Sequence, residues 1–268
     1  MKTKIEWTDA TWNPLRGCSR VSDGCRNCYA EKVAKRFSGP GQPYEGLIAK
    51  GGQWNGKIKL VPEKLSEPLR WKKPRMVFVN SMSDLFHESV PDDFIDKVFA
   101  IMAQCPEHTF QILTKRPKRM LSYLSAKNLG RRVNSYLPST VNYPIPPKNV
   151  WLGVSVEDQK SADERIPLLL RCPAAVRWVS AEPLLGPVNL TFEDRSDGML
   201  VDMLLPIDWV VVGGESGHGA RPMAHSWARS LRDQCVSAGV PFFMKQMGGR
   251  AKKTMAGIPE DLMIREYP

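Results

Sequence analysis

The stretch TFQILTKRPKRMLSYLSA, residues 109–126, carries in one piece the pattern that decides the fold. It opens with an apolar run at residues 109–113, continues with the polar residues Thr114, Lys115 and Arg116, and then places apolar residues at helical spacing. A near-continuous apolar run favours a strand buried on both faces, as in a parallel sheet. The stretch therefore predicts a strand, a polar turn and a helix in succession.

The same order recurs in both directions along the chain. Further apolar runs lie at residues 76–80, 150–154, 176–180, 209–212 and 241–244, and a segment near residues 5–7 or 11–15 could supply one more strand. Helical patterns lie at residues 28–37, 92–105, 161–171 and 226–238, the last followed by Gly239 as a C-cap. About six or seven strand–helix alternations predict an α/β fold, a complete or partial (β/α) barrel with mostly parallel strands.

The length suits one large α/β domain or two small ones, and we expect a single domain over residues 1–268. The chain has 42% hydrophobic and 25% charged residues, a normal globular composition. Loop insertions are expected near residues 38–57 and 127–148, with a further irregular stretch at residues 194–206. No apolar run approaches the roughly 18–20 residues of a membrane span, and the N-terminus lacks the pattern of a signal peptide. We therefore expect a cytoplasmic protein with no membrane partner.

The net charge of +10 favours polyanionic partners, because Lys and Arg release counterions from nucleic acid. The basic residues are partly grouped, at residues 72–75, 115–119, 131–132 and 250–253. Solvated helix ends and loops explain any one of these groups equally well. Stacking on bases or ordinary core packing could each account for the aromatic residues Trp54, Trp71, Tyr123, Tyr136 and Tyr143. Nucleic acid is thus a candidate partner, and the sequence identifies no partner protein.

The six cysteines are distributed unevenly. Cys105, Cys172 and Cys235 stand alone and are expected to pack as small buried side chains. Cys18, Cys25 and Cys28 lie within one short segment, next to Gly17 and Gly24, which would let a loop wrap closely around a metal.

Three clustered thiolates without a fourth ligand nearby suit a 4Fe–4S cluster whose unique iron is open to a substrate or cofactor. A structural zinc ion commonly needs four ligands. A zinc site would have to be closed by a distant His87, His218 or His225, which would make the chain a non-catalytic nucleic-acid-binding module. Three unliganded thiols, or a cluster-bearing nuclease-like repair protein, remain as further alternatives.

Polar residues follow each predicted strand. In parallel α/β folds ligands bind at the carboxyl ends of the strands, although turn chemistry explains any single polar residue there. Buried carboxylates at these positions should have partners, for which Lys115, Arg116 and Lys245 are available. The groups expected to converge on one ligand-binding mouth are Ser81, Ser83, Asp84, Lys115, Ser155, Glu157, Glu182, Gly213, Gly214, Glu215 and Lys245.

A resemblance runs along essentially the whole chain. The motifs that carry it lie at residues 12–29, 80–86, 113–117, 153–157, 180–186 and 213–217. On these motifs the chain resembles a phage-associated three-cysteine family of unknown function (DUF5131). A three-cysteine loop after the first strand of a parallel (β/α) barrel is also similar to the radical S-adenosylmethionine enzymes.

This resemblance implies an iron–sulfur enzyme that generates a 5′-deoxyadenosyl radical, with nucleic-acid modification or repair as a candidate use. It implies a 4Fe–4S cluster on the three clustered cysteines and S-adenosylmethionine as cofactor. It further implies that Ser81, Ser83 and Asp84 lie near the amino group of the cofactor, Lys115 near its carboxylate, Ser155 and Glu157 near its ribose, and Gly213 and Gly214 near its adenosine. Glu182, Glu215 and Lys245 remain as candidate catalytic residues, with Arg221 as another candidate for the substrate.

Overall fold

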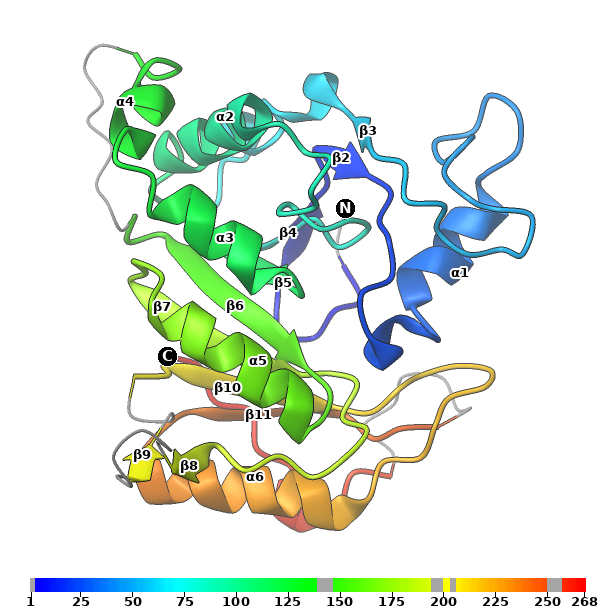
Figure 1. The fold of residues 1–268 in the computed structure, drawn as a ribbon, viewed down its shortest axis with the longest axis vertical. Coiled ribbons are helices and arrows are strands. Elements are labelled where there is room, and N and C mark those ends of the chain that lie inside the picture. The colour runs from blue at the N-terminus through cyan, green and yellow to red at the C-terminus, as the bar shows by residue number, and fades with distance from the viewer. Residues whose placement is uncertain (1–2, 139–146, 194–199, 203–205, 250–256) are drawn as a thin grey trace. The chain divides into compact units, whose positions relative to one another are not determined.

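The computed structural model describes residues 3–138, 147–193, 200–202, 206–249 and 257–268 (Figure 1). Its strands are β1 (Ala10–Trp12), β2 (Leu15–Arg16), β3 (Lys59–Leu60), β4 (Met76–Val79), β5 (Thr109–Thr114), β6 (Val150–Val156), β7 (Val176–Ala181), β8 (Thr191–Glu193), β9 (Leu200–Asp202), β10 (Trp209–Gly213) and β11 (Phe242–Gln246). Its helices are α1 (Tyr29–Arg36), α2 (Asp92–Ala103), α3 (Pro117–Leu124), α4 (Leu129–Asn134), α5 (Gln159–Leu170) and α6 (His225–Ala238), with short 3₁₀ turns at Asp23–Cys25, Pro62–Lys64, Pro68–Arg70 and Glu260–Leu262.

The described strands form one main sheet of seven strands in the order β1-β4-β5-β6-β7-β10-β11. The pairs β1–β4, β4–β5, β7–β10 and β10–β11 are parallel. Two antiparallel pairs, β2–β3 and β8–β9, lie outside this sheet. The α/β class and the parallel strands are confirmed, and of the two expected barrel forms the partial one applies, because the sheet has fewer than the eight strands of a complete barrel.

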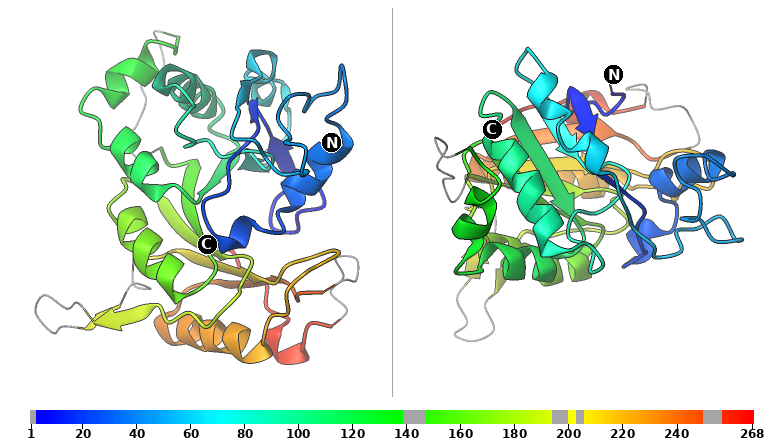
Figure 2. Two further views of the ribbon diagram at one scale, coloured as in Figure 1. Left: turned by 45° about the vertical axis from the view of Figure 1, so that its right-hand side comes forward. Right: turned by 90° about the horizontal axis from the view of Figure 1, so that it is seen from above.

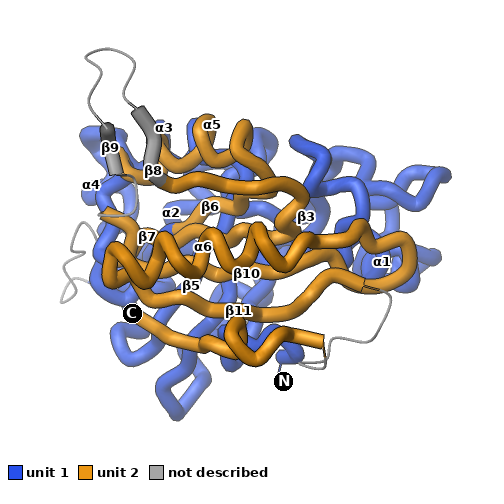
Figure 3. Tube along the Cα trace, turned by 90° about the horizontal axis from the view of Figure 1, so that it is seen from below, with its two compact units in different colours: residues 1–152, 172–175 blue, residues 153–171, 176–268 orange. Residues whose placement is uncertain are grey.

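The chain divides into two compact units (Figure 3). Unit 1 comprises residues 1–152 and 172–175, and unit 2 comprises residues 153–171 and 176–268. Strand β6 passes from one unit into the other. The single-domain organisation expected over residues 1–268 stays a prediction.

Unit 1 contains β1 to β5 and helices α1 to α4. Helix α2 follows Pro91 and begins with Asp92 and Asp93, whose charges complement the positive end of the helix dipole. Its apolar residues Phe94, Ile95, Val98, Phe99 and Met102 are buried at helical spacing. These side chains form the core of unit 1 together with the buried residues Val77, Val79, Phe110 and Ile112 of β4 and β5.

Unit 2 contains β7, β10, β11 and most of β6. All five residues of β10 are buried, and α6 packs on β10 and β11. Helix α5 begins with a capping box, in which the Asp158 carboxylate accepts a bond from the backbone of Ser161 and the Ser161 hydroxyl bonds back to the N-cap. Helix α6 ends at Gly239, whose φ of 69° is the expected left-handed C-cap.

Most sequence-based boundaries agree with the structure to within two residues, and three do not. The strand expected near residues 5–7 or 11–15 is Ala10–Trp12, with Leu15–Arg16 as a separate short strand. The insertion at residues 127–148 contains helix α4, while residues 139–146 lie outside the described part. The irregular stretch contains strand β9, and residues 194–199 and 203–205 are likewise outside it.

The sequence pattern did not predict helix α4, because this helix is short and contains a glycine. It forms because Leu129 and Val133 bury their side chains and Arg132 pairs with Asp96 of α2, at 3.0 Å. Tertiary contacts of this kind outweigh the low intrinsic propensity of so short a helix. In the described residues, no helix is long and apolar enough to cross a membrane.

Candidate functional site

The three clustered cysteines lie in unit 1 on the segment between β2 and α1. Gly17 opens this segment with a φ of 93°, and a Cβ there would lie 2.2 Å from the carbonyl oxygen of Lys57. Only glycine therefore allows the chain to pass at this point. The 3₁₀ turn Asp23–Cys25 follows, and Cys28 is the N-cap of α1. Cys18, Cys25 and Cys28 are partly buried, and none is in a disulfide.

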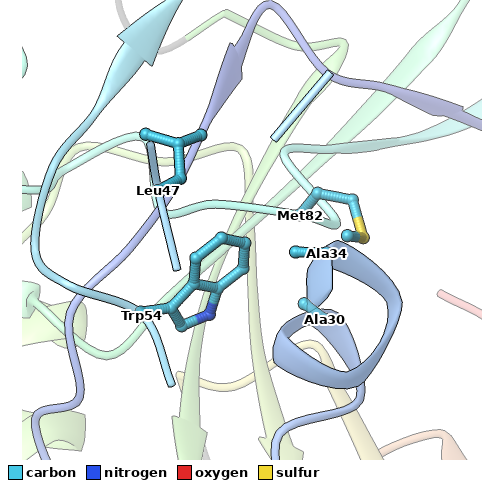
Figure 4. Close-up of a cluster of buried hydrophobic side chains, with 5 residues drawn as sticks. All are labelled: Ala30, Ala34, Leu47, Trp54 and Met82. Atoms are coloured by element: carbon cyan, nitrogen blue, oxygen red, sulfur yellow. The ribbon is translucent and has the colours of Figure 1, made fainter. Parts of the chain in front are cut away.

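A small apolar cluster supports this cysteine loop. Figure 4 shows Ala30 and Ala34 of α1 with Leu47, Trp54 and Met82, and both Cys18 and Cys28 pack against this group. The loop insertion at residues 38–57 thus covers α1, and the two lie side by side in both views of Figure 2. For Trp54, which is 8% exposed, the core-packing interpretation is the correct one.

A buried carboxylate joins the cysteine loop, α1 and the insertion. Glu31 accepts two bonds from the Arg20 guanidinium, at 2.9 and 2.6 Å, and one from the backbone N–H of Trp54, at 3.1 Å. One carboxylate therefore connects these three segments and helps to hold the loop in place.

Arg116 lies two residues after β5, at the N-cap of α3, and makes several polar contacts with the cysteine loop and with residues 84–88. Its guanidinium donates to Asp84 at 3.1 Å, to the Ser19 hydroxyl at 2.7 Å and carbonyl at 3.1 Å, and to the Cys18 sulfur at 3.8 Å. Its Nε also donates to Glu88 at 3.0 Å. The residue is 6% exposed, so its charge is balanced by these carboxylates within a largely desolvated site.

Burial favours the protonated form of two of these thiols, Cys18 and Cys28. It raises the pKa of the Cys18 thiol to about 12; Asp84 adds to the rise and Arg116 opposes it. Burial also raises the pKa of Cys28, against the backbone N–H groups of Glu31 and Ala30 at the start of α1. Metal binding would therefore release protons from these sulfurs.

The donor set suits a thiolate-held cluster, because three sulfurs lie on one loop, with the Arg116 guanidinium near Cys18 and the N-terminus of α1 at Cys28 to stabilise negative charge. In the described part of the chain, no three or more His, Cys, Asp or Glu side chains are arranged as a metal-holding group. The three-sulfur site therefore stays a prediction.

The residues expected to contact S-adenosylmethionine from unit 1 mostly have partners within that unit. The Ser81 hydroxyl donates to Asn13 and the Ser83 hydroxyl to the carbonyl of Leu15. Asp84 is buried and accepts bonds from the Thr114 hydroxyl and from the backbone N–H groups of Phe86 and Lys115. With Arg116 as a further donor, the oxygens of Asp84 have little acceptor capacity left.

Asn80 is the exception among the polar groups at the end of β4. It is 3% exposed and has a φ of 61°, which is unusual for a residue other than glycine. Within the described residues, neither its Oδ1 nor its Nδ2 has a hydrogen-bond partner. Because an unpaired buried amide is costly, Asn80 is a strong candidate for ligand contact. It lies in the motif at residues 80–86, where no sequence pattern favours it over Ser81 or Asp84 as a site residue.

The other predicted site residues lie in unit 2, and the three carboxylates among them each pair with a cation. Glu157 accepts two bonds from Arg165, at 2.8 and 3.2 Å, and the carbonyl of Ser155 accepts one from the same guanidinium. Lys245 lies 2.7 Å from Glu182, to which the Ser180 hydroxyl also donates. Arg221 pairs with Glu215. Each of these carboxylates thus has a cationic partner, as expected, but of the cations named from the sequence only Lys245 is one of them; Arg165 and Arg221 were not foreseen as partners.

Gly213, the last residue of β10, and Gly214, the next residue, each allow a close approach within unit 2. A Cβ on Gly213 would lie 2.4 Å from a Glu182 oxygen, and one on Gly214 would lie 2.4 Å from the backbone nitrogen of Gly248. Both glycines therefore make room for neighbouring protein atoms. Their expected role in contacting adenosine stays a prediction, as do the catalytic roles of Glu182, Glu215 and Lys245.

These features define an α/β protein with a seven-stranded sheet, among the described residues, and a three-cysteine loop in unit 1. The chain belongs to a family of proteins of unknown function (DUF5131), whose model matches residues 2–267. No curated protein matches the chain. The family expected from the sequence motifs is thereby confirmed.

Two solved structures of spore photoproduct lyase are similar to the chain. A cysteine-to-serine mutant has 12% identity and a TM-score of 0.43, and the match covers 87% of this chain and 62% of that chain. A cysteine-to-alanine mutant with dinucleoside spore photoproduct has 12% identity and a TM-score of 0.40, with 82% and 58% covered. The chain thus spans about three-fifths of the length of these structures.

Proposed function

We propose that the chain is an iron–sulfur enzyme that uses S-adenosylmethionine, with Cys18, Cys25 and Cys28 as the ligands of a 4Fe–4S cluster. The observation that carries the proposal is that these thiols lie on one loop, with the guanidinium of Arg116 3.8 Å from the Cys18 sulfur. When bound, the cluster would supply the electron for reductive cleavage of the cofactor's sulfonium. The residues of the chain hold the loop, orient the cofactor and keep water away.

Asn80 supports the cofactor part of the proposal. A primary amide complements an α-amino acid, because its oxygen accepts from an ammonium group and its nitrogen donates to a carboxylate. S-Adenosylmethionine carries both groups. The unpartnered amide of Asn80, buried in the described part of unit 1, therefore matches the methionine end of the cofactor in hydrogen-bonding type.

We propose nucleic acid as the substrate class, on the charge around the cysteine loop. Residues 15–60 contain nine Lys and Arg against three Asp and Glu. On α1, which begins directly after Cys28, Tyr29, Lys32 and Arg36 follow each other at helical spacing on one face, and Tyr29 is 44% exposed. An exposed aromatic ring beside two cations suits a base stacked next to its phosphates.

The proposal is tested by purifying the chain without oxygen and measuring iron, sulfide and zinc. We expect a brown protein with broad absorbance near ~400 nm, as iron–sulfur clusters show, and 5′-deoxyadenosine formed from S-adenosylmethionine after reduction. Cys18→Ala should remove the cluster, whereas Cys235→Ala, which changes a buried thiol outside the loop, should keep the iron content. Full iron in Cys18→Ala would contradict the three-ligand assignment.

A structural zinc site is the second candidate function, because His87 lies close to the cysteine loop. Its Nε2 is 2.9 Å from the hydroxyl of Ser19, the residue after Cys18. A colourless protein with one zinc ion per chain, lost on His87→Ala, would establish this alternative as a non-catalytic module.

A further inference from the structure

We infer that Arg116 is a positioning residue that sets the reduction potential of the cluster through a hydrogen bond to the Cys18 sulfur. The inference rests on the proposed function, since it requires that Cys18 ligates iron. The resemblance to radical S-adenosylmethionine enzymes implied a contact of Lys115 with the cofactor's carboxylate. It implied no role for the neighbouring Arg116, to which the inference now assigns one.

The orientation of Arg116 is fixed from several sides. Its Nε donates to Glu88 and its Nη1 to Asp84, and Nη2 donates to both oxygens of Ser19. Asp84 is itself held by the Thr114 hydroxyl, at 2.8 and 2.9 Å. Because each nitrogen is engaged, the guanidinium cannot turn away without breaking several charge-assisted bonds.

The same Nη1 that meets Asp84 also lies 3.8 Å from the Cys18 sulfur, within hydrogen-bond range for sulfur. An N–H bond to a cluster thiolate draws electron density from the sulfur and stabilises the more negative, reduced cluster. The guanidinium is almost completely buried, so solvent screens this effect little. Arg116 should therefore make the cluster easier to reduce.

The test is a redox titration of the iron-loaded protein, followed by the electron paramagnetic resonance signal of the reduced cluster. Arg116→Met should shift the midpoint potential to a more negative value at unchanged iron content. Arg116→Lys, which keeps the charge but loses the planar fork, should give a smaller negative shift. Arg119→Met is the matched control, because Arg119 lies on the neighbouring helix α3 and pairs with Asp92. The midpoint potential of the cluster in this variant should equal that of the wild type.

A wild-type potential in Arg116→Met would overturn the inference. So would loss of iron from both Arg116 variants at an unchanged melting temperature, since Arg116 would then only shape the loop. A wild-type chain that takes up no iron under reconstitution would instead remove the proposed function, and the inference with it.

Discussion

His87 is the residue at which the surroundings of the cysteine loop become sensitive to pH. Its Nδ1 accepts a bond from the backbone N–H of Ser89, at 3.1 Å, so the neutral ring carries its proton on Nε2 and donates it to Ser19. Burial lowers the pKa of His87 below its usual 6.5, and Arg116 lowers it further, while Glu88 and Asp84 oppose the change. The folded protein therefore favours the neutral ring.

This preference links stability to pH. Below pH 6.5 the unfolded chain protonates His87 while the folded chain does not, so the stabilisation present above pH 6.5 is lost as the pH falls toward the lower pKa of the folded state. We expect the melting temperature to fall more between pH 7.5 and 5, about the range over which histidine titrates, in the wild type than in His87→Gln. His225→Gln, at an exposed histidine, should follow the wild type. Parallel profiles for wild type and His87→Gln would contradict the expectation.

Strand β6 and helix α5 are joined by a buried ion pair. The side chains of Glu157 and Arg165 are 2% and 8% exposed, and their fork-to-fork geometry uses both carboxylate oxygens. The ion pair thus holds the end of the strand, the turn and the helix together. Glu157 is bound to an arginine of the helix that follows it in the sequence. The geometry favours a structural role for Glu157 alongside the expected contact with ribose.

Arg165→Met should lower the free energy of unfolding by about 3–5 kcal/mol, because it leaves a buried carboxylate without its partner. The matched control is Glu164→Met, which removes an exposed charge one position earlier on α5 and should change stability by about 0.5 kcal/mol or less. Urea unfolding of both variants measures the difference. Equal stabilities would show that solvent or another cation replaces Arg165.

Over the whole molecule, the excess of positive charge is not evenly spread. Residues 15–60 hold a large share of it, around the cysteine loop of unit 1. If the positive charge were evenly spread, a polyanion would bind the chain without a preferred surface. A local excess of positive charge instead predicts one preferred surface for binding a polyanion.

Lys32→Glu/Arg36→Glu should weaken binding of single-stranded DNA and reduce the salt dependence of the affinity, since phosphate contacts are lost. Arg70→Glu/Lys72→Glu is the control, because it changes the net charge by the same amount at two exposed residues away from α1. Fluorescence anisotropy at several salt concentrations gives both quantities. Equal weakening by the two double variants would assign the binding to overall charge.

The sequence by itself determined the succession of strands and helices and the grouping of the three cysteines. Apolar runs and helical periodicity are local properties, so residues 109–126 predict β5 and α3 without reference to the rest of the chain. The family could be predicted from the sequence for the same reason, because its motifs are local stretches that lie where the predicted strands end. Helix α4 did not follow, because it depends on contacts with α2.

Only the tertiary structure decided which polar residues are engaged and which are free to bind a ligand. The sequence shows Lys115 and Arg116 as adjacent cations, but the fold buries Arg116 against Asp84 and Cys18. At the end of β4 it likewise leaves the buried side chain of Asn80, rather than that of Ser81 or Asp84, without a hydrogen-bond partner among the described residues. Hydrogen-bond partners distant in sequence meet only when strands are paired, and no local pattern encodes that pairing.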